Sequence, residues 1–299
     1  MKTDNRKYLD PVVLSKLGNM EMVARGAVEG FFTGLHPSPF HGFSVEYSDH
    51  RAYQQGDELK FLDWKVFGRS DKLYIKRFHQ ETNLTANILL DSSKSMSFAG
   101  ETNVSKLDYG SYLTAALTYL LLGQADSVSL TLFAEKITQR VPPQSRRSHL
   151  SHILTALTNN KPGGPTALAD ALHWQANISS RKGIIILISD MLDDLDEIFE
   201  GLAHLKHQKQ DIIIFHTLDR QELALDYRGL VQFEDMESDQ VCRTYADSVQ
   251  VEYQKKVQEF IDNVNDYANR HQIDYCLLDT SEPLDKALMA YLHKRKQSL

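Results

Sequence analysis

The chain lacks the features that mark most zinc proteins, secreted proteins and membrane proteins. Its 299 residues include two cysteines, Cys242 and Cys276, which lie far apart and outside any CxxC pattern. We therefore expect neither a disulfide framework nor a zinc site, and a reducing, cytoplasmic location. No run of about 18 apolar residues is present, so we expect no membrane span. The first twenty residues also lack the continuous apolar segment of a signal peptide.

Signatures of common enzyme classes are absent too. The sequence contains no phosphate-binding P-loop, no GxSxG nucleophile turn and no HExxH zinc motif. Its 12 histidines are scattered without the spacing of a metal pair, and we expect them to be structural or solvated. The formal net charge of −7 argues against nucleic-acid binding by the chain as a whole.

The most informative segment that is present joins an apolar run to a cluster of oxygen-bearing side chains. Ile88–Leu90 is followed by Asp91, Ser93 and Ser95. A short apolar run of this kind predicts a buried strand of a parallel sheet, and ligands bind at the carboxyl ends of such strands. A tight loop after the strand can turn these three alternating oxygens toward one point, which suits Mg²⁺ or Mn²⁺. The alternative is a turn closed by the same side chains.

Two further segments add oxygen-bearing side chains to the same edge. Thr166 ends a loop rich in glycine and proline, just before a predicted helix, where a hydroxyl often caps the backbone. The apolar run 183–188 leads through Ser189 to Asp190. If the two apolar strands are parallel neighbours, Asp91 and Asp190 lie at one edge and Thr166 enters from the loop between them.

The ordered set Asp91-x-Ser93-x-Ser95, Thr166 and Asp190 resembles the metal-ion-dependent adhesion site of von Willebrand factor A domains. The resemblance implies that Mg²⁺, or Mn²⁺, is bound by the three hydroxyls and by the two carboxylates, directly or through water. It also implies that one coordination position is left for a carboxylate of a partner protein. We expect the nearby Asp193 and Asp194 to cap the helix that follows.

From about residue 87 the chain alternates predicted strands and helices, which predicts an α/β fold with a doubly wound, mostly parallel sheet. Further predicted strands cover 126–133, 137–141, 211–216 and 273–278. Predicted helices cover 106–122, 149–158, 166–175, 194–206, 254–270 and 283–295. Pro142 and Pro143 are expected to end the second of those strands, at an edge of the sheet.

The first 85 residues differ in kind, because a helical pattern at 11–32 gives way to aromatic and β-branched residues mixed with charges. This region carries a motif set made of Glu46, Arg51, Tyr53, Gly56, Asp57, Asp63, Trp64 and Arg69. Placed ahead of an A-like domain, the set resembles the bacterial domain-of-unknown-function 58 family. Tyr47, Lys60, Leu62 and Gly68 stand where that family has Phe, Arg, Ile and Ala.

The family resemblance implies an organisation and a role. Residues 1–85 are expected to form a helix and β-rich region packed on a von Willebrand A-like domain at 86–299. Members of the family accompany MoxR-type AAA+ ATPases, which implies an adaptor or co-chaperone that binds a client carboxylate and is not an enzyme. Many members carry two transmembrane helices, and this chain resembles the form without them.

Three alternatives stay open at this stage. A Mg²⁺-dependent phosphatase or phosphotransferase could use Asp91 as nucleophile, although haloacid-dehalogenase-like enzymes have a second Asp where this chain has Ser93. A metal-free structural scaffold would use the same five residues as caps and turn closures. Basic and aromatic residues at 60–79 are typical of single-strand nucleic-acid binders, but a half-solvated β-hairpin is the favoured interpretation.

The charged residues of the motif set are expected to form a structural ion-pair network made of Arg51, Asp57, Asp63 and Arg69.

Overall fold

The computed structural model describes residues 84–234, 236 and 241–298, together with 21–22, 24, 27–28, 50–52, 68 and 74–76. The chain divides into two compact units, one of residues 1–36 and 84–299 and the other of residues 37–83. In the smaller unit, β1 (His50–Ala52) pairs antiparallel with β2 (Tyr74–Lys76). A hairpin was predicted within residues 60–79, but the described strand that pairs with β2 is β1, which precedes that segment.

The larger unit is built on a six-stranded sheet with the order β10-β7-β6-β3-β4-β5. Its strands are β3 (Thr85–Asp91), β4 (Ser127–Phe133), β5 (Ile137–Gln144), β6 (Ile184–Ser189), β7 (Asp211–Leu218) and β10 (Asp274–Asp279). All neighbours are parallel except β4 and β5. The predicted mostly parallel α/β sheet is therefore confirmed. From β3 the chain first adds β4 on one side of β3 and later adds β6 on the other side. The direction in which strands are added therefore changes between β3 and β6. In open parallel sheets, ligands bind in the crevice at the carboxyl ends of the two strands where this change occurs.

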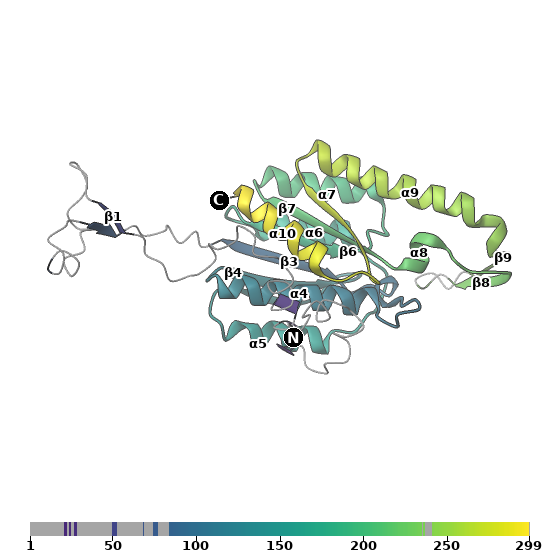
Figure 1. The fold of residues 1–299 in the computed structure, drawn as a ribbon. Helices are drawn as coiled ribbons and strands as arrows, with labels where there is room; N and C mark the ends of the chain where they lie inside the picture. Colours follow the sequence, from purple (N-terminus) through teal and green to yellow (C-terminus); the bar gives the residue numbers. More distant parts are fainter. Residues whose placement is uncertain are drawn as a thin grey trace. The chain divides into compact units, whose positions relative to one another are not determined.

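Helices cover both faces of this sheet (Figure 1). They are α4 (Lys106–Gly123), α5 (His149–Asn159), α6 (Leu168–Ile178), α7 (Leu195–His207), α9 (Ala246–Arg270) and α10 (Asp285–Ser298). Figure 1 shows α4 and α5 on the opposite side of the sheet from α7 and α9. Within the described part of the chain, no helix combines the length and the apolar character needed to cross a membrane.

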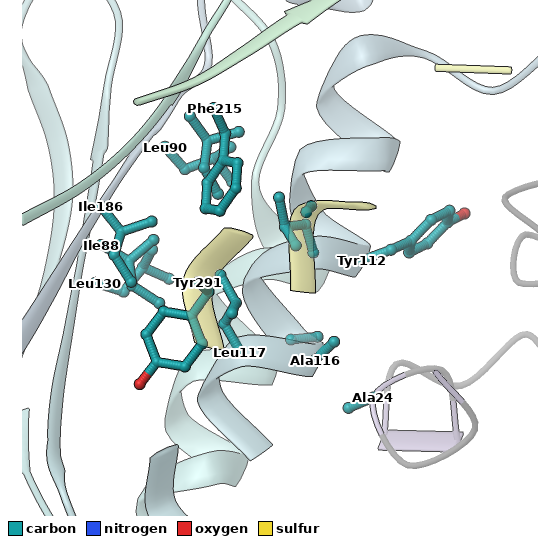
Figure 2. Close-up of a cluster of buried hydrophobic side chains, with 14 of the residues drawn as sticks. Ala24, Ile88, Leu90, Tyr112, Ala116, Leu117, Leu130, Ile186, Phe215 and Tyr291 are labelled. Atoms are coloured by element: carbon teal, nitrogen blue, oxygen red, sulfur yellow. The ribbon is translucent and has the colours of Figure 1, made fainter. Parts of the chain in front are cut away.

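Two buried clusters, one on each face, explain the uninterrupted apolar runs Ile88–Leu90 of β3 and Ile184–Ile188 of β6. Ile88 and Leu90 of β3 face the cluster that contains residues of α4, α5 and α10, whereas Leu89 faces the cluster of α6, α7 and α9. Figure 2 shows Ile88, Leu90 and Phe215 in the first cluster, with Leu117 and Tyr291. Strands buried on both faces do not alternate polar and apolar residues, so the run before Asp91 follows from its central place in the sheet.

The edge strand β5 is longer than predicted. It runs to Gln144 through Pro142 and Pro143, although the prolines were expected to end it. The pairing of β5 with β4 shifts register between Val128 and Leu130, which face Gln144 and Val141 respectively. The prolines lie in this irregular stretch of an edge strand, where the sheet does not need a hydrogen bond from their backbone nitrogen.

The segment between β7 and α9 contains elements that the sequence pattern did not predict. They are α8 (Arg220–Ala224), β8 (Leu230–Glu234) and β9 (Val241–Tyr245), of which β8 and β9 pair antiparallel. Helix α9 begins at Ala246 rather than at 254. After Ala246, the buried positions of α9 are Ile261, Val264 and Ala268, so its first turns lack the apolar periodicity that reveals a helix.

Gly110 allows α4 to lie close to the sheet beside the strand ends. A Cβ atom at this position would lie 2.8 Å from Leu90 Cδ1 and 3.1 Å from Ile188 Cγ2. We expect Gly110→Val to lower the free energy of unfolding by about 1–3 kcal/mol through overpacking, measured by urea denaturation. Gly123→Val in the same helix is the matched control, because a Cβ there has no atom within 4 Å. A Gly110→Val protein as stable as the control would show that α4 has room to shift.

Candidate functional site

Asp91 lies at the centre of a group of converging polar side chains at the carboxyl end of β3. The residue is fully buried. Its Oδ1 accepts a hydrogen bond from the Ser93 backbone N–H at 2.8 Å. Its Oδ2 accepts from Ser189 Oγ at 2.7 Å and from Thr166 Oγ1 at 3.2 Å. Beside them, Ser93 Oγ and Ser95 Oγ are 3.0 Å apart. Three separate segments of the chain thus place oxygen atoms around one carboxylate.

Backbone hydrogen bonds hold the loop after β3 against the loop that carries Thr166. Gly163 N–H donates to Ser92 O at 3.0 Å, and Lys94 N–H donates to Gly164 O at 2.9 Å. Asn160 Nδ2 also donates to Ser92 Oγ at 2.9 Å. Gly164 has φ of 71°, a left-handed conformation that favours glycine. The breaker-rich sequence before Thr166 therefore builds a wall of the site.

Asp190 follows β6, the parallel neighbour of β3, and is also fully buried. Its Oδ2 accepts from Lys106 Nζ at 2.8 Å, and the same Nζ donates to Glu222 Oε1 of α8 at 2.6 Å. Lys106 is the first residue of α4, and its side chain is fully buried. Met191, the next residue after Asp190, has φ of 59°, an uncommon conformation that aims the chain away from the strand. A buried ammonium group thus lies between two carboxylates.

Burial and mutual charge set the protonation of this group. Burial, together with the charge of Asp190, raises the pKa of Asp91 from 3.8 to about 7. Burial acts to lower the pKa of Lys106, but the charges of Asp190 and Glu222 outweigh it and the pKa lies above its usual 10.5. Lys106 is therefore a permanent cation near neutral pH.

His216 of β7 supports Asp190 from the neighbouring strand. His216 Nε2 lies 3.0 Å from the Asp190 backbone oxygen, and Nδ1 lies 2.7 Å from Tyr275 Oη. Burial lowers the pKa of His216 from 6.5 to about 4, so the imidazole is neutral at physiological pH. The backbone oxygen requires Nε2 to carry the proton, which makes Nδ1 the acceptor of the tyrosine hydroxyl.

The donor set fits a hard divalent cation. All five side chains present oxygen, as Mg²⁺ and Mn²⁺ prefer. Ser93 Oγ and Ser95 Oγ lie 3.0 Å apart, and Thr166 Oγ1 lies 3.2 Å from Asp91 Oδ2, so these oxygens are grouped closely enough to hold one small ion. Among the described residues, there is no group of three His, Cys, Asp or Glu side chains that could hold a metal ion. Metal binding here would therefore depend on the three hydroxyl groups together with the two carboxylates.

The structure assigns roles to the predicted capping residues. Thr166 does not cap α6, because its hydroxyl donates to Asp91 and the N-cap residue is Ala167. Asp194 caps α7 as predicted, accepting from the first-turn N–H groups. The prediction for Asp193 was wrong, since its Oδ2 accepts from Leu168 N–H at the start of α6. A carboxylate here satisfies the helix that follows Thr166 and so fixes that loop.

Of the family motif set, the structure describes Arg51, which lies in β1 opposite Ile75. The other members lie outside the described residues: Glu46, Tyr53, Gly56, Asp57, Asp63, Trp64 and Arg69. The expected ion-pair network and the division of the chain at residue 85 stay predictions.

Sequence reasoning missed three side chains that complete the site: Lys106, Ser189 and Glu222. Ser189 was visible as the last polar residue before Asp190, but nothing in the sequence indicated that its hydroxyl reaches Asp91. A lysine at the first position of a helix opposes the helix dipole, and this was the one signal that Lys106 serves another purpose. Glu222 lies in a five-residue helix that the pattern did not predict.

Comparison with known proteins places this site in a family context. An uncharacterized protein of Mycobacterium tuberculosis (strain ATCC 25618 / H37Rv) is 24% identical over 235 residues, 77% of this chain and 72% of that protein. Among solved structures, the conserved hypothetical protein BatB from Bacteroides thetaiotaomicron is similar over 71% of this chain and 99% of its own, at 16% identity and a TM-score of 0.47. An aerotolerance-related membrane protein from Bacteroides fragilis NCTC 9343 gives 17% identity, the same coverages and a TM-score of 0.46. Residues 49–260 match the family described as "Protein of unknown function DUF58", and the chain belongs to that family.

Proposed function

We propose that this protein is a divalent-cation-dependent adaptor that binds a carboxylate of a partner protein. The observation that carries the proposal is that Ser93, Thr166 and Ser189 all donate hydrogen bonds to the buried Asp91, with Ser95 Oγ 3.0 Å from Ser93 Oγ. The ordered pattern of Asp91, Ser93, Ser95, Thr166 and Asp190 supports the finer assignment to a von Willebrand A-like fold with a metal-ion-dependent adhesion site.

The chemistry of the site supports binding by this route. The hydroxyls of Ser93, Ser95 and Thr166 and the carboxylate of Asp91 would hold Mg²⁺ or Mn²⁺, with Asp190 bound directly or through water. The bound ion would supply an exchangeable position for a strong anionic oxygen ligand. The neutral hydroxyls neutralise none of the ion's charge, which favours an incoming Asp or Glu side chain.

For the partner, we propose a MoxR-type AAA+ ATPase together with a carboxylate-bearing client protein, in the cytoplasm. This part rests on the family to which the chain belongs and on the association of that family with such ATPases. The adaptor would present clients to the ATPase, and nucleic acid has no part in the proposal.

The state of Asp91 favours binding over phosphoryl transfer. A carboxylate nucleophile must be accessible to a phosphate ester, whereas Asp91 is fully buried. Both of its oxygens accept hydrogen bonds from neighbouring groups. The residue two positions on, Ser93, also cannot serve as the general acid that such enzymes use.

Isothermal titration with Mg²⁺ and Mn²⁺ tests the metal site. We expect saturable one-site binding to the full chain and at least about tenfold weaker binding to Asp91→Asn, because the amide lacks the ligand charge. Asp196→Asn, which removes an exposed carboxylate from α7, is the control and should bind as the wild type does.

Partner binding is tested with a purified MoxR-type ATPase in Mg²⁺ and in EDTA. The association is expected in Mg²⁺ alone and is lost with Asp91→Asn. Association that persists in EDTA and in the variant would favour a metal-free scaffold. Hydrolysis of a generic phosphate ester in Mg²⁺, abolished by Asp91→Asn, would instead favour the phosphatase alternative.

A further inference from the structure

Lys106 is a buried cation that has no role in the proposed binding of a metal ion and a partner carboxylate. Its side chain is fully buried, and Nζ lies 2.8 Å from Asp190 Oδ2 and 2.6 Å from Glu222 Oε1. Lysine is almost never fully buried without partners, because desolvation of an ammonium group is costly. The first position of α4 also disfavours a cation electrostatically. The carboxylates of Asp190 and Glu222, rather than the helix, therefore explain why a lysine is tolerated at this buried position.

We propose that Lys106 is a positioning residue that acts as an internal counter-cation of the metal site, engaging Asp190 so that a bound divalent ion keeps positive charge for an external carboxylate. This inference rests on the proposed function and deepens it. It makes Lys106 responsible for the preference of the site for an anionic partner.

The charges explain why such a group is useful. Asp91 and Asp190 together would neutralise a divalent ion, and an external carboxylate would then bring unbalanced negative charge into a buried site. The ammonium group of Lys106 adds positive charge beside Asp190, although it shares that charge with Glu222, whose side chain is 21% exposed. Asp190 therefore neutralises less of the ion's charge, and an external carboxylate meets a more positive site. Burial makes this balance matter, because charges interact more strongly away from solvent.

Glu222 explains how Lys106 stays in place. Its carboxylate contacts the ammonium group from α8, and its side chain is 21% exposed, so solvent screens it more than it screens Asp190. Glu222 Oε2 also accepts from Asp219 N–H at 2.8 Å, which fixes the side chain. Lys106 therefore keeps one partner even when Asp190 turns toward a metal ion.

The first test measures Mn²⁺ binding to the full chain by isothermal titration, with and without acetate as the external carboxylate. We expect Lys106→Met to bind Mn²⁺ at least about tenfold more tightly than wild type, because Asp190 loses its competing cation. Acetate should strengthen Mn²⁺ binding to the wild type and do so less in the variant. Lys182→Met is the matched control, since Lys182 is 67% exposed and pairs with Asp211 at the surface.

A second variant keeps the test decisive if Lys106→Met does not fold. Glu222→Gln leaves Lys106 bound to Asp190 alone, and we expect Mn²⁺ binding at least about threefold weaker than in Asp196→Asn, which removes one exposed carboxylate. Equal Mn²⁺ affinity in the wild type and in every variant that folds would overturn the role of Lys106 and leave the proposed function intact. Absence of Mn²⁺ binding in all of them would overturn the proposed function and this inference with it.

Discussion

Asp91→Asn is expected to stabilise the metal-free protein at neutral and alkaline pH. In the wild type, burial and the charge of Asp190 raise the pKa of Asp91 from 3.8 to about 7, so its ionised form is unfavourable in the fold. Asparagine has the same shape without the charge. Its Oδ1 can accept from Ser93 N–H, and its Nδ2 can donate to the hydroxyls of Ser189 and Thr166, which now contact Oδ2.

The sign of the pH dependence follows from proton linkage. Between pH 3.8 and about 7 the folded state binds more protons at Asp91 than the unfolded state, so its contribution to stability falls as pH rises through this window. His216 acts in the opposite sense, because its pKa is lowered from 6.5 to about 4 and the stability it gives is lost as pH falls through that window. Since His216 is present in both proteins, the difference between wild type and Asp91→Asn isolates Asp91.

Thermal unfolding in EDTA from pH 4 to pH 8 measures this difference. The melting temperatures should agree near pH 4 and separate as pH rises, with the variant higher at pH 8. Mg²⁺ should then raise the melting temperature of the wild type and leave that of the variant unchanged. Parallel curves at every pH would mean that the ionised Asp91 is tolerated in the fold without a metal ion.

Asp219→Ala is expected to lower the free energy of unfolding by about 3–4 kcal/mol. Asp219 is 2% exposed and joins three segments. Its Oδ2 accepts from Gly100 N–H at 3.1 Å and from Thr280 Oγ1 at 2.9 Å, and its Oδ1 accepts from Gln221 N–H at 2.8 Å. Alanine would leave these donors without their carboxylate, and each buried donor left unsatisfied costs about 1–3 kcal/mol.

Urea denaturation of Asp219→Ala, with Asp226→Ala as control, checks this value. Asp226 lies in the same segment but is exposed, so its loss should change stability by less than about 0.5 kcal/mol. The two variants should share one m-value, because neither changes the surface exposed on unfolding. A loss below about 1 kcal/mol for Asp219→Ala would show that water or new partners replace the carboxylate.

Apolar runs and the polar residues after them were enough to predict the strands that carry the site and the order of their polar ends. The second half of β3, Ile88–Leu90, and most of β6, Ile184–Ile188, are apolar without interruption because helices cover both faces of the sheet, and these runs are readable in the sequence. Asp91 is the last residue of β3 and Asp190 directly follows β6, so their shared edge could be predicted from the parallel sheet alone. Thr166 could be predicted because breakers and a helix start are local signals.

The balance of charge in the site depends on contacts between residues that are far apart in the sequence. Lys106 meets Asp190 across 84 residues of sequence and Glu222 across 116, and neither separation leaves a local pattern. Asp193 serves α6 rather than the helix beside it for the same reason, because its donor, Leu168 N–H, comes from a distant part of the chain. Periodicity and capping rules report contacts within a few residues, whereas the burial of a lysine between two carboxylates depends on how α4, β6 and α8 pack together.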